Sequence, residues 1–269
     1  MIALLNGQHC DARLPANRAV AYGDSVFETL RVDRRGALWL EAHLERLLQG
    51  AARLGLSVDL AALRDEIDAV LATVTYAQVL KIQCYRQPGG RGYFGAERRS
   101  ERLLSLWPLP ATSCWQHGAT LMLCQTRLGD NAALAGIKHG NRLEQVLAAA
   151  EVARSRCDEG LMMDTSGCLV EGTRSNLFVI SDNTLLTPSL LRSGVAGIMR
   201  NEIIAWAKQQ GVACRERRFG PSVLARADEV FVCNSVFGIW PVKAVGCVSL
   251  PIGAMTRTLQ QEFERRFHA

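Results

Sequence analysis

Apolar and polar residues alternate along several short segments of the chain, and this period of two predicts β-strands. The clearest segments are residues 77–85, 119–124 and 176–180. Residues 161–164 and 168–171, joined by a Thr-Ser-Gly turn, are predicted to form a hairpin. Because segments with helical periodicity are interleaved with these strands, the pattern predicts a mixed α/β or α+β protein.

Two helices are predicted from apolar residues that recur three to four positions apart. The first covers residues 41–54 and ends before Gly55, and its apolar stripe consists of Leu44, Leu47, Leu48, Ala51 and Leu54. The second covers residue 142 to about residue 156, because Asn141 and Glu144 are spaced like a capping box. Its apolar residues are Leu143, Val146, Leu147 and Ala150.

A proline-containing segment, Trp107-Pro108-Leu109-Pro110-Ala111, separates the two halves of the chain. It is stiff, and its prolines cannot continue a strand ladder. We therefore expect an N-terminal α+β domain over residues 1–107, a linker over residues 108–114 and a C-terminal mixed α/β domain over residues 115–269.

The composition is that of an ordinary globular protein, with 269 residues of which 48% are hydrophobic and 21% charged. No segment approaches the ~20 apolar residues of a membrane span, and the first ten residues lack the features of a signal peptide. The nine cysteines are scattered without a C-x-x-C pair, which suggests neither a metal site nor a disulfide framework. We expect a cytoplasmic protein with no metal and no membrane partner.

A formal charge of +5 and a pI near 8.8 raise the alternative of a non-catalytic nucleic-acid-binding protein. Such a protein would need a contiguous arginine face with interleaved aromatic residues. Only 6% of the residues are aromatic, and the densest arginine groups, at 98–102 and 215–218, also contain glutamates. We therefore expect solvated surfaces and no nucleic-acid partner.

Covalent catalysis by an amine requires a lysine, and the chain contains four: Lys81, Lys138, Lys208 and Lys243. Three of them are predicted near a helix end or in strands without evident companions. Lys138 lies between glycines at positions 136 and 140, which allow a ligand to approach the backbone closely. From spacing alone, a surface lysine that precedes a helix is the commoner interpretation.

Residues 135–147, AGIKHGNRLEQVL, closely resemble the cofactor-lysine segment of the aminodeoxychorismate lyase family. That family is part of the fold type IV, branched-chain aminotransferase-like group of pyridoxal-phosphate enzymes. The resemblance implies a two-domain fold with the pyridoxal 5'-phosphate (PLP) site at the domain junction. It also implies that Lys138 holds PLP as a Schiff base and later removes the Cα proton of the substrate.

The resemblance extends over nearly the whole chain. Residues 22–31, YGDSVFETLR, are similar to the family's G-D-x-x-F-x-T/G segment. In the segment His43-x-x-Arg46-Leu47, the resemblance places Arg46 on the PLP phosphate. Helical periodicity alone places Arg46 opposite the apolar stripe, where we would expect solvent. A helix in a two-domain protein can use both faces, so we follow the resemblance.

Three later segments are also similar to the family. In residues 171–178, a glutamate is expected beside the pyridine nitrogen, where its negative charge keeps the ring protonated. Residues 194–200 begin a predicted helix whose first N–H groups are expected to bind phosphate. Residues 227–235 resemble a strand whose end meets the cofactor. The implied contacts are Glu171, Gly197, Ile198, Met199, Asn234 and Ser235.

Two features indicate which reaction follows proton removal. Residues 86–93, RQPGGRGY, resemble the lyases' R-G-x-G-G-R-G-Y loop, although they depart from it at the second and third positions. Guanidinium groups bind carboxylates well, and we expect the substrate to be bound by Arg86, Arg91 and Tyr93. Thr29 replaces a glycine of the branched-chain aminotransferases, and its hydroxyl is expected to assist proton delivery to the leaving group.

These features favour a lyase that converts 4-amino-4-deoxychorismate to 4-aminobenzoate and pyruvate, a step of folate synthesis. The alternative is a D-amino-acid or branched-chain aminotransferase of the same fold, which would require a 2-oxo acid acceptor. Family members resemble one another in forming homodimers whose sites borrow loops from the partner subunit. The resemblance therefore implies a homodimer that acts on a small-molecule substrate.

Overall fold

The computed structural model describes residues 4–9, 11, 13–88, 92–95, 97–111 and 114–268. The chain divides into two compact units. Unit 1 comprises Met1–Leu109 and Ile137–Asn141, and unit 2 comprises Pro110–Gly136 and Arg142–Ala269. The division after Leu109 falls inside the expected linker, but the Ile137–Asn141 segment groups with unit 1 and departs from the single C-terminal domain expected over residues 115–269.

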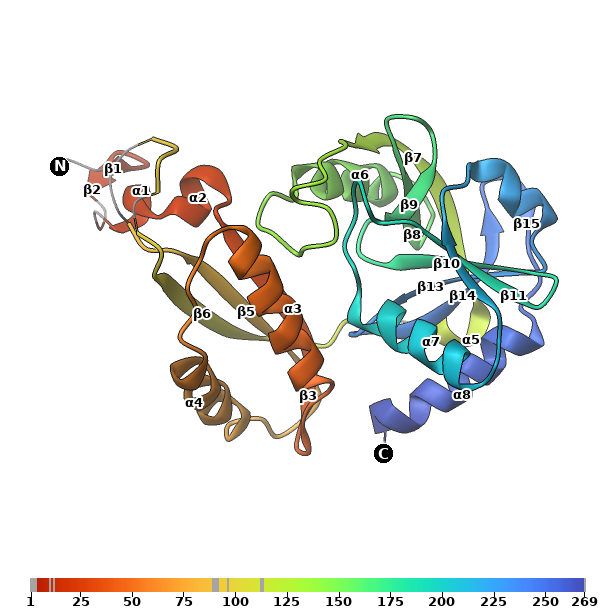
Figure 1. Cartoon of the computed structure of the whole chain (residues 1–269), viewed down its shortest axis with the longest axis horizontal. Coiled ribbons are helices and arrows are strands. Elements are labelled where there is room, and N and C mark those ends of the chain that lie inside the picture. The colour runs from red at the N-terminus through yellow and green to blue at the C-terminus, as the bar shows by residue number, and fades with distance from the viewer. Residues whose placement is uncertain are drawn as a thin grey trace. The chain divides into compact units, whose positions relative to one another are not determined.

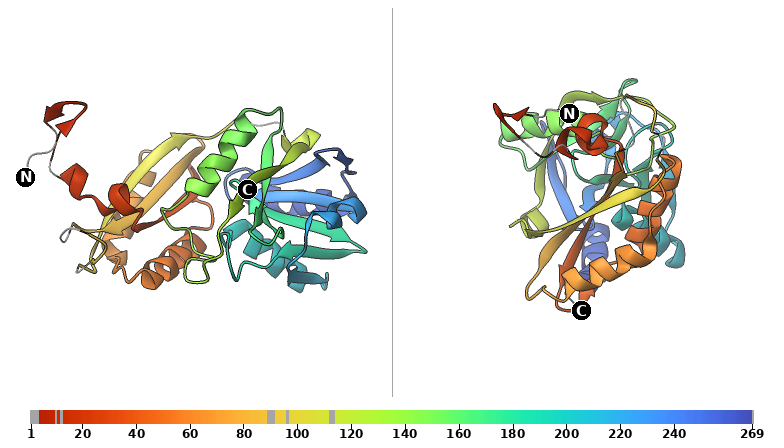
Figure 2. Two further views of the ribbon diagram at one scale, coloured as in Figure 1. Left: turned by 90° about the horizontal axis from the view of Figure 1, so that it is seen from above. Right: turned by 90° about the vertical axis from the view of Figure 1, so that its left-hand side faces the viewer.

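Unit 1 is an antiparallel sheet with two helices on one face (Figure 1). Its strand order is β4-β3-β5-β6, with the bounds Gly36–Ala37, Ser25–Asp33, Gln78–Arg86 and Ser100–Pro108. Figure 2 shows α3 (Leu40–Arg53) and α4 (Leu60–Leu71) on the same side of these strands. The even-numbered side chains of β3 are buried beneath them. The smaller elements are β1 (Leu4–Leu5), β2 (Gln8–His9), α1 (Arg13–Ala16) and α2 (Arg18–Tyr22).

The Ile137–Asn141 segment joins unit 1 because it pairs with the start of β3. Val26 and His139 form an antiparallel bridge. The N–H of Phe27 donates to the carbonyl of Lys138 at 2.9 Å, and the N–H of Gly140 donates to the carbonyl of Ser25 at 2.7 Å. Only glycine fits at position 140, because a Cβ there would lie 2.8 Å from the Gly23 carbonyl oxygen. This pairing fixes the backbone of Lys138.

Unit 2 is built on a mixed sheet with the order β12-β11-β10-β13-β14-β7-β8-β9, in which β7 runs parallel to both of its neighbours and β15 pairs with β14. Its strands are β7 (Ala119–Leu128), β8 (Glu159–Asp164), β9 (Leu169–Gly172), β10 (Asn176–Ser181), β11 (Thr184–Pro188), β12 (Cys214–Arg217), β13 (Glu229–Asn234), β14 (Gly238–Val245) and β15 (Val248–Ser249). Its helices are α5 (Cys114–His117), α6 (Leu143–Ala153), α7 (Ile198–Gln209), the 3₁₀-helix η1 (Pro221–Arg226) and α8 (Ala254–His268). None of the described helices has the length and apolar character needed to cross a bilayer.

Most predicted elements are confirmed, including the helix over residues 41–54 and the hairpin formed by β8 and β9. The details predicted for α6 are wrong. Its N-cap is Arg142 without a side-chain cap, and Glu144 accepts instead from the N–H of Gly129 at 2.9 Å. Its predicted apolar face is exposed, with Leu143 76%, Val146 60% and Leu147 58% accessible. The helix packs instead through Ala148, whose small side chain allows close approach to the sheet.

Candidate active site

Lys138 lies beside the aromatic start of β3. Its Nζ atom is 4.4 Å from the centre of the Phe27 ring, within the range of a cation–π contact. Thr29 follows two residues later on β3, and residues two apart on a strand point to the same face. The two residues predicted to be catalytic, Lys138 and Thr29, therefore belong to one face of the unit 1 sheet.

On the opposite, helix-covered face of β3 lies a buried ionic cluster of Glu28, His43 and Arg46. Glu28 Oε1 accepts from Arg46 Nε at 2.7 Å, and Glu28 Oε2 accepts from Arg46 Nη2. His43 Nδ1 is 2.7 Å from Glu28 Oε2. Burial alone would raise the pKa of Glu28, but the charge and hydrogen bonds of Arg46 and His43 outweigh it and lower that pKa to about 2. Glu28 is therefore ionised at neutral pH.

The helical period suggested that Arg46 faces solvent, and this expectation is wrong. The Arg46 side chain is only 11% exposed, because it pairs with Glu28 across the interface between α3 and β3. Glu28 is not among the site residues predicted from the sequence. A signal was present, because Glu28 stands between Val26 and Leu30 in the inward-facing register of β3, where a charge requires a partner. Contact between Arg46 and the PLP phosphate stays a prediction.

In unit 2, Glu171 is 5% exposed and is held by two donors. Its Oε2 accepts from the N–H of Val195 at 2.8 Å, and its Oε1 accepts from Gln145 Nε2 at 3.3 Å. Burial lowers the pKa of the Arg142 guanidinium, while the negative charge of Glu171 opposes that shift. Hydrogen bonds to a carboxylate favour its charged form. This setting suits the role predicted for Glu171, a fixed negative charge beside a protonated ring nitrogen.

The start of α7 is buried and has no side chain to cap it. Gly197 is the N-cap, and the two residues that follow, Ile198 and Met199, are 4% and 0% exposed. A Cβ on Gly197 would fall closer than 3.0 Å to Asn176 Oδ1, which is held in place because Asn176 Nδ2 donates to the Val195 carbonyl at 2.8 Å. A buried helix start requires acceptors for its first N–H groups, and a phosphate provides them.

Asn234, at the end of β13, builds a turn. Its Oδ1 accepts from the N–H groups of Val236 at 2.9 Å and Phe237 at 2.8 Å, and its Nδ2 donates to the Arg174 carbonyl at 3.0 Å. These contacts favour a structural role for the Asn234 side chain. Ser235 is 8% exposed. The cofactor contacts predicted for both residues stay predictions.

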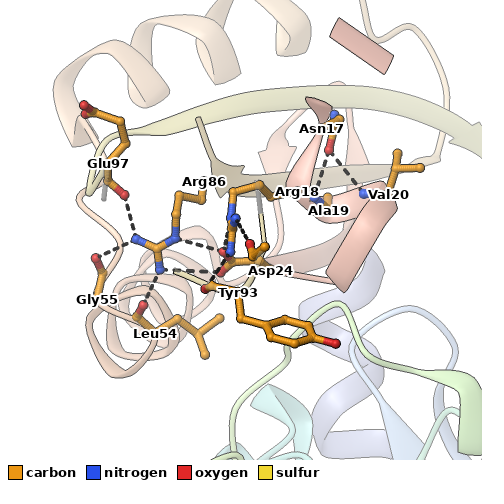
Figure 3. Close-up of polar contacts among 11 residues, drawn as sticks. Asn17, Arg18, Ala19, Val20, Asp24, Leu54, Gly55, Arg86, Tyr93 and Glu97 are labelled. Atoms are coloured by element: carbon orange, nitrogen blue, oxygen red, sulfur yellow. Dashed lines mark hydrogen bonds and ion pairs between the residues drawn. The ribbon is translucent and has the colours of Figure 1, made fainter. Parts of the chain in front are cut away.

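The Arg86 guanidinium makes its hydrogen bonds to acceptors within the protein, as Figure 3 shows. Its side chain is 10% exposed. The five N–H groups of its guanidinium face, at 2.6–3.5 Å, both carboxylate oxygens of Asp24 and the carbonyls of Leu54, Gly55 and Glu97. In this arrangement, Arg86 therefore has no N–H group left to donate to a substrate, as the prediction requires. Arg86 instead anchors the loop that follows β5.

A second arginine holds the middle of the same loop (Figure 3). Arg18 Nε donates to Asp24 Oδ2 at 2.9 Å, and its Nη1 and Nη2 donate to the carbonyls of Gly92 at 2.9 Å and Tyr93 at 3.1 Å. Burial would raise the pKa of Asp24, but Arg86 and Arg18 outweigh it and lower that pKa. Tyr93 is 90% exposed. Arg91 lies outside the described residues.

The predicted site residues thus fall into two sets, each described within its own unit. Lys138, Thr29, Arg46, Arg86 and Tyr93 belong to unit 1, and Glu171, Gly197 to Met199, Asn234 and Ser235 belong to unit 2. Among the residues that the structure describes, no group of three or more histidine, cysteine, aspartate or glutamate side chains is arranged to hold a metal ion.

The chain belongs to the amino-transferase class IV family, which it matches over residues 25–245. It is 34% identical to the aminodeoxychorismate lyase of Vibrio harveyi, across 91% of this chain and 93% of that protein. Its structure is similar to the crystal structure of 4-amino-4-deoxychorismate lyase from Pseudomonas aeruginosa, with a TM-score of 0.89 across 95% of this chain and 94% of that chain. The two sequences are 44% identical. The branched-chain amino acid aminotransferase of Escherichia coli has a TM-score of 0.84 at 27% identity, across 97% of this chain and 92% of that chain.

These comparisons confirm the family resemblance and the fold class inferred from the sequence. The fold is shared by lyases and aminotransferases, so it does not by itself select the reaction.

Proposed function

We propose that this chain is a PLP-dependent lyase that converts 4-amino-4-deoxychorismate to 4-aminobenzoate and pyruvate in folate synthesis. The observation that carries the proposal is the likeness to a lyase of that specificity, at 44% identity over almost the whole of both chains. The likeness to an aminotransferase of the same family is lower, at 27% identity. The family match over residues 25–245 spans the cofactor-lysine segment and Thr29.

The residues present fit PLP. The buried, uncapped start of α7 at Gly197, Ile198 and Met199 suits a phosphate, and Arg46 supplies a cation whose orientation is fixed by Glu28. Glu171 is a buried carboxylate held by two donors, which suits a protonated ring nitrogen. We propose that these residues serve one cofactor, with Ser235 near it.

PLP, when bound, supplies an electron sink for the charge that develops at the substrate Cα. Lys138 would hold the cofactor covalently, and its neutral amine would accept the Cα proton of the substrate. The carbon–oxygen bond to the enolpyruvyl group then breaks and the ring becomes aromatic. Thr29, on the Lys138 side of β3, delivers a proton to the departing group, which leaves as pyruvate.

Substrate carboxylates are bound by the loop that carries Arg91 and Tyr93. The carbonyls of Gly92 and Tyr93 accept from Arg18, and the loop exit is held by Arg86, so the loop is tied to the core of unit 1 at two points. Arg86 therefore enters the proposal as an anchor of this loop, in place of the direct substrate contact expected from the sequence.

We also propose a cytoplasmic homodimer. Large apolar side chains are exposed on α6, at Leu143, Val146 and Leu147, and on β6, at Leu103 and Trp107. Such surfaces favour a protein partner. The described cysteines are free thiols, which are stable in a reducing compartment. Light scattering on the purified protein tests the dimer, and a monomeric mass at micromolar concentration would contradict it.

The reaction is tested by mixing the purified protein with 4-amino-4-deoxychorismate without any 2-oxo acid. The lyase produces 4-aminobenzoate and pyruvate in equal amounts under these conditions. The alternative, an aminotransferase, is supported by the relatives that are named branched-chain aminotransferases. It predicts turnover only after an acceptor is added. Absence of both products would refute the lyase and leave the family assignment intact.

A further inference from the structure

Glu28 is a wholly buried carboxylate at the centre of the unit 1 core. Its neighbours on the same face of β3 are Val26 and Leu30, both of which are buried among aliphatic side chains. An ion pair in such a place is rarely a net gain for stability, because the cost of removing both charges from water offsets their attraction. An apolar pair of similar volume would fill the same space. The cluster therefore requires an explanation other than stability.

The geometry of the pair fixes the direction of Arg46. Both carboxylate oxygens of Glu28 accept from the same edge of the guanidinium, one from Nε and one from Nη2. A guanidinium is planar and rigid, so two parallel hydrogen bonds on one edge define its plane and the direction of Nη1. Without them, the long Arg46 side chain would sample several rotamers.

His43 fixes Glu28 in turn. It is wholly buried on α3, and its Nδ1 lies 2.7 Å from Glu28 Oε2. Burial lowers the pKa of His43, and the positive charges of Arg46 and Lys138 lower it further against the opposing effect of Glu28. A neutral His43 therefore donates its Nδ1 proton to the ionised Glu28. Three donors from one helix hold the carboxylate in a single orientation.

We propose that Glu28 is a positioning residue for cofactor phosphate, which it orients through Arg46 with His43 as its support. The inference rests on the proposed function, because it assumes that Arg46 binds the phosphate. It predicts that Glu28 contributes to affinity for the phosphate group and not for the rest of the cofactor.

The test compares the dissociation constants of PLP and of pyridoxal, which lacks the phosphate, for the full-length protein freed of cofactor. The variants are Glu28→Gln, Arg46→Met and the double variant. We expect Arg46→Met to reduce the preference for PLP over pyridoxal by about 10- to 100-fold, the range of a hydrogen bond to a charged group. Glu28→Gln should reduce this preference by about 10-fold and have no further effect once Arg46 is gone.

Glu66→Gln is the matched control, because Glu66 makes the same two-bond contact with Arg102 in unit 1, at 2.8 and 2.7 Å. It should leave the preference for PLP unchanged. If Glu28→Gln does not fold, Glu28→Asp retains the charge and shortens its reach by one methylene, and the same loss of preference is expected.

Three results would overturn the inference. If Glu28→Gln keeps the wild-type preference while Arg46→Met loses it, Glu28 does not position Arg46, and the proposed role of Arg46 stands. If Arg46→Met keeps the preference, the role of Arg46 in the proposed function fails as well. If Glu28→Gln weakens the binding of PLP and pyridoxal equally, Glu28 has only a structural role.

Discussion

Gly197 provides a sharp test of the proposed phosphate-binding site at the start of α7, because the space around it admits no side chain. In Gly197→Ala, the new Cβ would fall closer than 3.0 Å to Asn176 Oδ1. The backbone at position 197 is extended, with φ −64° and ψ 142°, which alanine adopts without strain. The effect of the substitution therefore comes from the clash alone.

The clash has two ways to relax, and both are costly. Asn176 must retreat by roughly 1 Å and give up its hydrogen bond to the Val195 carbonyl, or the start of α7 must move away from it. Overpacking costs about 1–3 kcal/mol and a lost hydrogen bond about 1 kcal/mol, so we expect the free energy of unfolding to fall by about 2–4 kcal/mol. Displacement of the Ile198 and Met199 N–H groups should weaken PLP binding by about 10-fold or more.

Urea unfolding and titration of the cofactor-free protein with PLP measure the two effects. Gly220→Ala is the matched control, because Gly220 also precedes a helix, and its added Cβ would meet only Gly167 O, at 3.7 Å. The control should keep wild-type PLP affinity. A Gly197→Ala protein that binds PLP as tightly as this control would refute the assignment of the phosphate to the start of α7.

Three further predictions follow from the unit 1 contacts. Thr29→Ala should slow pyruvate release by about 10²-fold or more while Thr29→Ser retains most of the rate, and pyruvate release at the wild-type rate by Thr29→Ala would exclude its role in proton delivery. Arg86→Ala should lower the free energy of unfolding by about 3 kcal/mol, because it leaves Asp24 with one cation and frees three carbonyls, whereas the exposed Arg98→Ala should be neutral in the same urea titration. The pKa of Glu28 is lowered from 4.5 to about 2. The stabilisation that comes from this shift in pKa is therefore fully present in the free energy of unfolding above pH 4.5, and it is lost as the pH falls towards 2. In Glu28→Gln, the free energy of unfolding should therefore fall less steeply between pH 4.5 and pH 2 than in the wild type. An unchanged pH dependence in this range would contradict the ion pair between Glu28 and Arg46.

Local periodicity was sufficient to predict several of the elements, because strands and helices that bury one face repeat every two or 3.6 residues. It identified the helices α3 and α6 and the hairpin of β8 and β9. Periodicity did not indicate what the apolar face of each element packs against. In α6 the apolar residues Leu143, Val146 and Leu147 are exposed, and the helix packs through the smaller Ala148.

Contacts between distant parts of the sequence were not predictable from local patterns. The Ile137–Asn141 segment pairs with β3 across more than a hundred residues of sequence, and no local signal reports such a pairing. The partner of Arg46 is Glu28, and Arg86 lies among carbonyls that no side-chain pattern reveals. The site residues were predicted from the family resemblance. The contacts that hold several of them in place are seen only in the structure.

Comparison of Lys138→Ala with Lys81→Ala tests whether Lys138 is the cofactor lysine. The Nζ atoms of both lysines lie over the Phe27 ring, at 4.4 Å for Lys138 and 5.5 Å for Lys81. Lys138→Ala should lose both the cofactor fixed by borohydride and the release of pyruvate from 4-amino-4-deoxychorismate, while Lys81→Ala should keep the covalent cofactor. Normal turnover by Lys138→Ala would contradict the assignment of the active site.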